Sequence, residues 1–272
     1  MFRAFTYLCL FLGTVFVLTG YLFHLDKLYI RQVYISGNKQ VLSSQIFSVT
    51  KGVLGGRYYG LYPKNNLLIY PKKLIKESLL RSIPWIASVG VFSDINSLFI
   101  EVEERVPKYL WCDDLSEPIL DRTCYYLDMN GLAFDKAPSF SSHVYLEFYG
   151  GNKRGGYIGK SILSPDTLRI VLEMKDSMEK TLKDKYPFLV RIYGVYVYNN
   201  DDYEFLFTQG RKESKIIFNL PKNASEDEKM RVDKKFKAIM TSPFFMKELN
   251  NTNRQLKYID LRFGKKVFYK FD

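Results

Sequence analysis

The most constraining feature of the chain is Ala4 to Phe23, a run of 20 residues without a charged side chain. About 20 apolar residues span the hydrocarbon core of a bilayer. A cleavable signal peptide would have a shorter apolar region and a site of small residues for cleavage. We therefore predict that residues 1–25 form a short cytoplasmic tail and an uncleaved transmembrane helix, embedded through residues 4–23. The competing interpretation, a buried core helix, would require a polar stripe.

Long domains are translocated despite nearby positive charges. Together with the predicted single span, this rule predicts a single-pass protein of the cell membrane. Its N-terminus would be cytoplasmic, and the rest of the chain after the span would be extracytoplasmic. The formal charge is +11, which suits anionic head groups or wall polymers but equally a generally basic surface. Lysine and arginine are scattered without a nucleic-acid-binding signature, so nucleic acid is not an expected partner.

Residues 28–105 follow the order strand, helix, helix, strand, strand. Leu28 to Ser36 is typical of a strand entering a turn at Gly37. Helical spacing follows Ser43 and again follows Pro71, and a glycine-rich loop separates the two helices. Leu98 to Arg105 alternates apolar and polar side chains, as does a strand with one buried face. We expect Trp85, Ile35, Leu98, Ile100 and Val102 in the core of this domain.

The pattern of apolar residues and turn residues in 106–272 predicts short strands and two helices. Asp128 to Gly131 has the chemistry of a tight hairpin turn. A serine cap and a following proline begin one helix at Ser164. Ser225 and Glu228 form a capping box that opens the second helix, which Pro243 ends. An extended mixed sheet with helices on one face is the simplest architecture.

Five stretches of the sequence can be compared with known families: residues 33–38 (VYISGN), 84–86 (PWI), 98–107 (LFIEVEERVP), 126–134 (YLDMNGLAF) and 258–263 (YIDLRF). Together they resemble the FtsQ/DivIB family of bacterial cell division proteins. The resemblance implies an α+β protein with an N-terminal transmembrane helix, a POTRA domain (β-α-α-β-β) at 28–105 and a β-domain at 106–272. The proline usual in the family's POTRA hairpin turn is absent between Phe92 and Leu98.

The same resemblance implies a function. It predicts a membrane scaffold of the divisome at the septum, which binds FtsB/DivIC-like and FtsL-like partners and helps to control septal wall synthesis. The alternative is a POTRA-bearing component of protein export or outer-membrane insertion, although such proteins have a barrel or several POTRA repeats. An enzyme acting on the cell wall is a third possibility and the least favoured.

The final hairpin, Tyr258 to Phe271, is the predicted partner surface. A terminal strand tends to lie at a sheet edge, where its backbone can accept a strand from another chain. The resemblance places FtsB/DivIC docking in the same segment. The residues expected to take part are Tyr258, Asp260, Arg262, Phe263, Lys266 and Phe268. The competing interpretation is a closing strand of the core whose lysines only protect an edge.

Other residues are expected to have structural roles. Arg105 and Pro107 belong to a family-style junction, in which the guanidinium could pair with a neighbouring carboxylate and fix the interdomain angle. Asp128 and Gly131 form the hairpin turn, and Trp85 belongs to the first core.

Catalytic and metal-binding patterns are weak. His143 is the only histidine outside the predicted membrane boundary, so neither a triad nor a zinc centre is indicated. We expect no enzyme activity, cofactor, metal or small-molecule substrate. Cys112 and Cys124 could form a disulfide worth about 3 kcal/mol in an oxidising compartment. Two buried free thiols are the favoured alternative.

Overall fold

The computed structural model describes residues 2–23, 25–113, 122–150, 156–185, 190–198, 201–209, 212–251 and 254–272. It consists of two compact units, Met1–Arg105 and Val106–Asp272. The division falls after Arg105, where the sequence predicted the end of the POTRA domain. Each unit has its own hydrophobic core.

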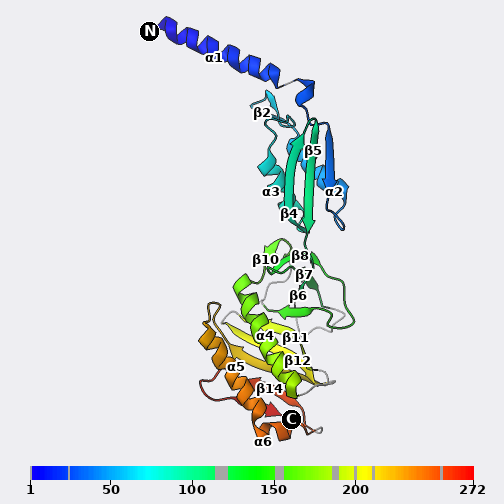
Figure 1. Cartoon of the computed structure of the whole chain (residues 1–272), viewed down its shortest axis with the longest axis vertical. Helices are drawn as coiled ribbons and strands as arrows, with labels where there is room; N and C mark the ends of the chain where they lie inside the picture. Colours follow the sequence, from blue (N-terminus) through cyan, green and yellow to red (C-terminus); the bar gives the residue numbers. More distant parts are fainter. Residues whose placement is uncertain are drawn as a thin grey trace. The chain divides into compact units, whose positions relative to one another are not determined.

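The first unit contains a three-stranded sheet of order β1–β5–β4 (Figure 1). Strand β1 (Gln32–Ser36) runs parallel to β5 (Ser97–Glu104), and β4 (Ile86–Asp94) is antiparallel to it. Helices α2 (Ser43–Leu54) and α3 (Lys72–Ser82) bury Ile46 and Ile75 in the core. The observed element order therefore contains the predicted strand, helix, helix, strand, strand.

The alternation in β5 is confirmed, because Leu98, Ile100 and Val102 are buried. Ile35 and Trp85 were also expected in the core, but they are only partly buried and pack against its margin. The predicted glycine-rich loop is partly structured. Helix α2 continues through Gly52, and β2 (Arg57–Tyr58) pairs with β3 (Tyr62–Pro63) in a small hairpin.

Helix α1 (Phe2–Leu22) and the short η1 (Asp26–Leu28) precede the sheet. Across the part of the chain that the structure describes, no helix combines the length and the apolar character needed to cross a membrane. The predicted transmembrane helix is therefore wrong, as is the single-pass localisation that depended on it. The prediction rested on the 20 uncharged residues Ala4 to Phe23, and the absence of charge is a weaker condition than the length and apolar character needed to cross a membrane.

Glu104, at the end of β5, binds the turn that follows β1. Its carboxylate accepts hydrogen bonds from the backbone N–H groups of Lys39, Gln40 and Val41 at 2.7–3.0 Å. Burial acts to raise the pKa of Glu104, but these backbone donors outweigh it and lower the pKa below its ordinary value of 4.5. The carboxylate therefore joins two segments that lie more than 60 residues apart in the sequence.

Replacing Glu104 with glutamine is expected to destabilise the first unit by about 1.5–3 kcal/mol, because charged hydrogen bonds to backbone donors become neutral. Because the folded-state pKa is lowered, this contribution is present above the unfolded-state pKa and is lost as the pH falls through the folded-state value. Urea unfolding followed by Trp85 emission in a Trp111→Phe background measures both effects. Glu101→Gln, which alters an exposed carboxylate on the same strand, is the matched control. Equal stability of the two variants at neutral pH would contradict the prediction.

The second unit contains a ten-stranded mixed sheet of order β10–β8–β7–β6–β9–β11–β12–β13–β14–β15. These strands are β6 (Tyr109–Cys112), β7 (Cys124–Leu127), β8 (Leu132–Lys136), β9 (Leu146–Tyr149), β10 (Lys160–Ser161), β11 (Val190–Val197), β12 (Asp202–Gln209), β13 (Lys212–Asn219), β14 (Leu256–Asp260) and β15 (Phe268–Phe271). The sheet is mixed because β9 runs parallel to both β6 and β11, and β13 runs parallel to β14. The predicted mixed sheet is confirmed.

Three helices accompany this sheet: α4 (Pro165–Lys185), α5 (Glu226–Thr241) and α6 (Pro243–Leu249) (Figure 1). Both predicted helix starts are confirmed. Ser164 Oγ accepts from the Thr167 N–H, and Ser225 with Glu228 forms the capping box. Pro243 does more than end a helix, because it is the first residue of α6. Apolar side chains of all three helices pack into the main core with alternate residues of the strands.

Candidate partner-binding surface

Strand β15 is the last strand of the large sheet. Among the described strands it pairs with β14 alone, in antiparallel register from Leu256↔Phe271 to Asp260↔Phe268. Its other side is therefore an edge with backbone groups available for another strand. Strand β10 forms the opposite edge but has only two residues. The edge formed by β15, which has four residues, is therefore the longer of the two.

The two faces of β15 have different roles. Tyr269 and Phe271 are half-buried, and their ring centroids lie 5.0 and 5.5 Å from that of the fully buried Phe245 in α6. Phe268 and Lys270 alternate with them and are exposed. One face therefore holds the strand on the core, while the other is open to solvent.

Phe263, in the turn before β15, extends this open face. Its ring meets Phe268 edge to face at 5.2 Å, and about half of each side chain is exposed (52% and 49%). The Lys266 N–H donates to the Phe263 carbonyl oxygen at 2.8 Å and closes the turn. We call Phe263, Lys265, Lys266, Phe268 and Lys270 the β15 edge surface.

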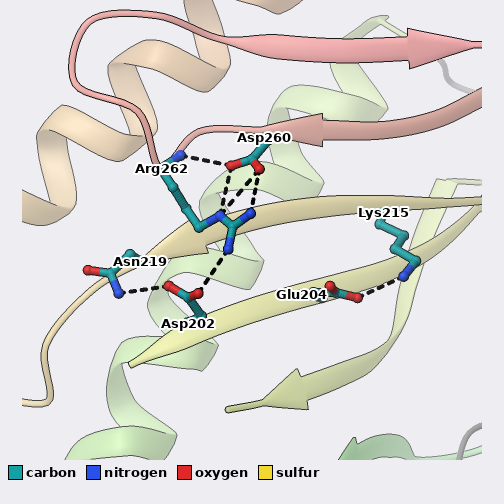
Figure 2. Close-up of polar contacts among 6 residues, drawn as sticks. All are labelled: Asp202, Glu204, Lys215, Asn219, Asp260 and Arg262. Carbon is teal, nitrogen blue, oxygen red and sulfur yellow. Dashed lines mark hydrogen bonds and ion pairs between the residues drawn. The ribbon is translucent and has the colours of Figure 1, made fainter. Parts of the chain in front are cut away.

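Arg262 anchors the same turn through contacts with two carboxylates (Figure 2). Its guanidinium donates to both carboxylate oxygens of Asp260 at 2.7–3.2 Å and to Asp202 of β12 at 2.9 Å. Asn219 of β13 also donates to Asp202, at 2.8 Å. The network therefore ties the end of β14 to β12 and β13.

Burial makes this network structural. The side chains of Asp260 and Asp202 are only 8% and 13% exposed. Hydrogen bonding to Asp260, followed by hydrogen bonding to Asp202, raises the pKa of Arg262 despite the opposing effect of burial. The guanidinium also lies 5.7 Å from the centre of the Phe263 ring. Arg262 thereby orients an aromatic side chain of the β15 edge surface.

The six residues predicted to bind a partner divide into two groups. Phe263, Lys266 and Phe268 are exposed on the β15 edge surface, whereas Tyr258 is half-buried and Asp260 is buried. Arg262 is exposed, but its guanidinium is already paired with Asp260 and Asp202 of the same chain. Sequence periodicity could not show this, because Asp202 lies 60 residues away. The exposed neighbours Lys265 and Lys270 complete the surface.

The predicted hairpin turn is present at Asp128 to Gly131. Asp128 is buried, and its carboxylate accepts the N–H groups of Asn130 and Leu132 at 2.9 and 3.0 Å. Gly131 has φ +74°, and a β-carbon there would lie 2.4 Å from the Leu163 carbonyl oxygen. The turn therefore needs both residues for its geometry.

The junction residues make local contacts in the structure. Arg105 Nε donates to the Pro84 carbonyl oxygen at 2.9 Å, and the Arg105 N–H donates to the Trp85 carbonyl oxygen at 2.8 Å. Arg105 is thus bound to the segment that precedes β4. Pro107 follows β5 and precedes β6 along the chain, and its side chain is half-buried. The proposed control of the interdomain angle stays a prediction.

Cys112 and Cys124 are joined by a disulfide, in place of the two free thiols that the sequence favoured. They occupy directly opposite positions on β6 and β7. Their sequence separation of 12 residues concealed this proximity.

A buried polar cluster was not predicted. Glu147 accepts a hydrogen bond from the Tyr149 hydroxyl and lies 2.8 Å from His143 Nδ1, while Arg122 donates to Tyr149 at 3.0 Å. Burial, together with hydrogen bonding to Glu147, strongly raises the pKa of Tyr149. The buried carboxylate of Glu147 therefore has polar partners in Tyr149, His143 and Arg122. Within the described ranges, no group of three histidine, cysteine or acidic residues could hold a metal ion.

No protein-family model matches this chain, and a search of curated proteins finds no match. The fold and the β15 edge surface therefore carry the functional argument, and the FtsQ/DivIB resemblance stands on the quoted residues alone.

Proposed function

We propose that this chain is a protein-binding scaffold of the bacterial division machinery. In this proposal an FtsB/DivIC-like partner adds a strand to β15, and an FtsL-like protein joins the same complex. The chain catalyses no reaction and helps to control septal wall synthesis through binding. The resemblance to FtsQ/DivIB supplies the biological role. The observation that carries the binding mode is the one-sided pairing of β15.

The arrangement of β15 suits strand addition. Main-chain hydrogen bonds would supply affinity, and alternate side chains would supply specificity. The strand is held in an extended form by β14 and by the packing of Tyr269 and Phe271 on Phe245. A preorganised strand loses less conformational entropy on binding than a disordered one.

The side chains of the β15 edge surface indicate which chemical properties the partner needs. Phe263 and Phe268 offer an apolar anchor, because exposed aromatic side chains commonly dominate binding energy. Lys265, Lys266 and Lys270 are exposed around them. The complementary segment is therefore an extended strand with apolar side chains and several carboxylates.

The test is binding of the full chain to the FtsB/DivIC-like protein of the same organism. Phe268→Asp is expected to weaken binding roughly 30-fold or more, since truncation of an aromatic hot spot typically costs about 2 kcal/mol or more. Isothermal titration calorimetry gives the affinity. Hydrogen exchange shows whether the amides of β15 become protected in the complex.

Phe47→Asp is the matched control, because Phe47 is also an exposed phenylalanine but lies on α2 of the first unit. It is expected to leave the affinity unchanged. Folding of both variants is checked by circular dichroism. A folded Phe268→Asp variant that binds as tightly as the parent would place the partner surface elsewhere.

A further inference from the structure

The first unit has an aromatic ladder on the outer face of its sheet. Phe99 of β5 stacks on Tyr34 of β1, with ring centroids 5.2 Å apart and planes 18° from parallel. It also stacks on Phe92 of β4, at 5.3 Å and 6°. The three residues occupy matching register positions, since Tyr34 and Phe92 are both opposite Phe99. Tyr34 and Phe92 are exposed, although both are large and apolar.

The ladder ends at both edges of the sheet. Strands β1 and β4 are the outer strands of this three-stranded sheet, so no described strand covers the far side of the Tyr34 or Phe92 ring. At these spacings the stacked rings face one another, which leaves one outward ring face at each end. An aromatic ring face carries partial negative charge and attracts a guanidinium or ammonium group.

The residues around the ladder carry one sign of charge. The outward positions of the three strands contain Asp94, Glu101 and Glu103 but neither lysine nor arginine. The remaining outward positions are Gln32, Ser36, Ser88, Gly90 and Ser97. Within the described residues the three carboxylates form no ion pair, although Ser88 donates to Glu103 and the Ile95 N–H donates to Asp94. This local acidity contrasts with the formal charge of +11 for the whole chain.

Gly90 leaves space beside the ladder. It pairs with Glu101 across the strands and precedes Phe92 by one outward position. A β-carbon at Gly90 would make only ordinary contacts with Glu101, at 3.6–3.8 Å. The Glu101 carboxylate lies over Gly90, with Oε2 3.8 Å from the position of a β-carbon, and Glu101 is exposed to solvent beside the ladder.

We propose that this face, defined by Tyr34, Phe92, Phe99, Glu101 and Glu103, binds a basic segment of a partner protein. Arginine or lysine side chains of the segment lie on the outer ring faces and pair with the carboxylates. Charge complementarity identifies the occupant, since a nucleic acid or an acidic peptide would be repelled. Cross-strand aromatic pairs also stabilise a sheet, but sheet stability does not require neighbouring carboxylates. This binding is independent of the function proposed for β15.

The experiment measures fluorescence anisotropy with the full chain and a labelled peptide of about 12 residues, long enough at roughly 3.3 Å per residue to cross the face. The peptide alternates arginine with valine and serine. Replacing Glu101 and Glu103 with glutamine is expected to weaken binding about five- to tenfold and to reduce its salt dependence. Phe92→Ser with Tyr34→Ser is expected to weaken it by a similar factor, through loss of the ring faces.

The matched control is Asp184→Asn with Asp227→Asn, which removes the same charge from exposed positions of the second unit. It is expected to retain binding. Equal affinity of the control and the glutamate variant would overturn the proposal, as would equal binding of a peptide with glutamate in place of arginine. Two other results would overturn the assignment to a basic partner segment. One is binding of a single-stranded DNA of similar length that is lost when Phe92 is replaced, and the other is self-association of the chain that is lost in the same variant.

Discussion

Replacing Arg262 with alanine is expected to lower the free energy of unfolding of the second unit by about 2–4 kcal/mol. Removing the cation of a buried ion pair costs about 3–5 kcal/mol because it leaves an uncompensated buried charge, and the 34% exposure of the Arg262 side chain reduces that cost. In this variant the carboxylates of Asp260 and Asp202 both lose the cation that they share. Neither side chain is more than 13% exposed. Urea unfolding followed by Trp111 emission in a Trp85→Phe background measures the loss.

A second variant separates the unpaired charges from the loss of packing. Adding Asp260→Asn and Asp202→Asn to Arg262→Ala removes both orphaned carboxylates and is expected to recover part of the lost stability, since interacting residues are not additive. Lys270→Ala, an exposed change on β15, is the control and should alter stability by less than about 0.5 kcal/mol. An Arg262→Ala variant as stable as the Lys270→Ala variant would show that the network contributes little.

The same network has a consequence for binding. Arg262 orients Phe263 through the contact between the guanidinium and the ring, and it holds the turn that precedes β15. The β15 edge surface therefore depends on an ion pair whose carboxylates are largely buried, although Arg262 itself is partly exposed.

Gly37→Ala is expected to destabilise the first unit by more than about 3 kcal/mol. Gly37 follows β1 with φ +86°, and a β-carbon there would lie 2.0 Å from the carbonyl oxygen of Val102. The obstructing atom belongs to the backbone of the central strand β5, so no side-chain rotation can relieve the contact. The cost adds to that of a left-handed conformation in a residue with a side chain, of order 1 kcal/mol. Thermal unfolding followed by Trp85 emission in the Trp111→Phe background checks the prediction.

Gly60→Ala is the matched control, because Gly60 also has a positive φ, +72°, but a β-carbon there meets no atom within 4 Å. It retains the conformational cost and lacks the contact with the backbone. The difference between the two variants therefore measures the close approach of β1 and β5 alone. Equal stability of the two variants would mean that β5 shifts at little cost.

Local patterns in the sequence predicted much of the fold. The alternation of Leu98 to Glu103 defined the central strand, because period-two burial requires only one covered face. The Ser225 capping box and the Asp128 turn were also predicted correctly, since their hydrogen bonds join residues within four positions of each other. These features depend on neighbours in the sequence.

Counting charges was misleading at the N-terminus. Ala4 to Phe23 contains no charged residue, yet no described helix meets the length and apolarity needed to cross a membrane. The glycine-rich segment was predicted as a loop from its glycines alone. Helix α2 nevertheless continues through Gly52, because its last residue, Leu54, is buried in the core.

The sequence by itself determined the strand, helix, helix, strand, strand order within the first unit, the two helix starts in the second, and the apolar and basic character of the last strand. Only the tertiary structure decided that Asp260 is buried, that Arg262 is shared with Asp202, and that Cys112 meets Cys124. It also decided that Tyr34, Phe92 and Phe99 form one ladder. Strand propensity and capping act over a few residues, whereas the register between distant strands is selected by the packing of the whole core, and that packing determines which charges remain exposed for a partner.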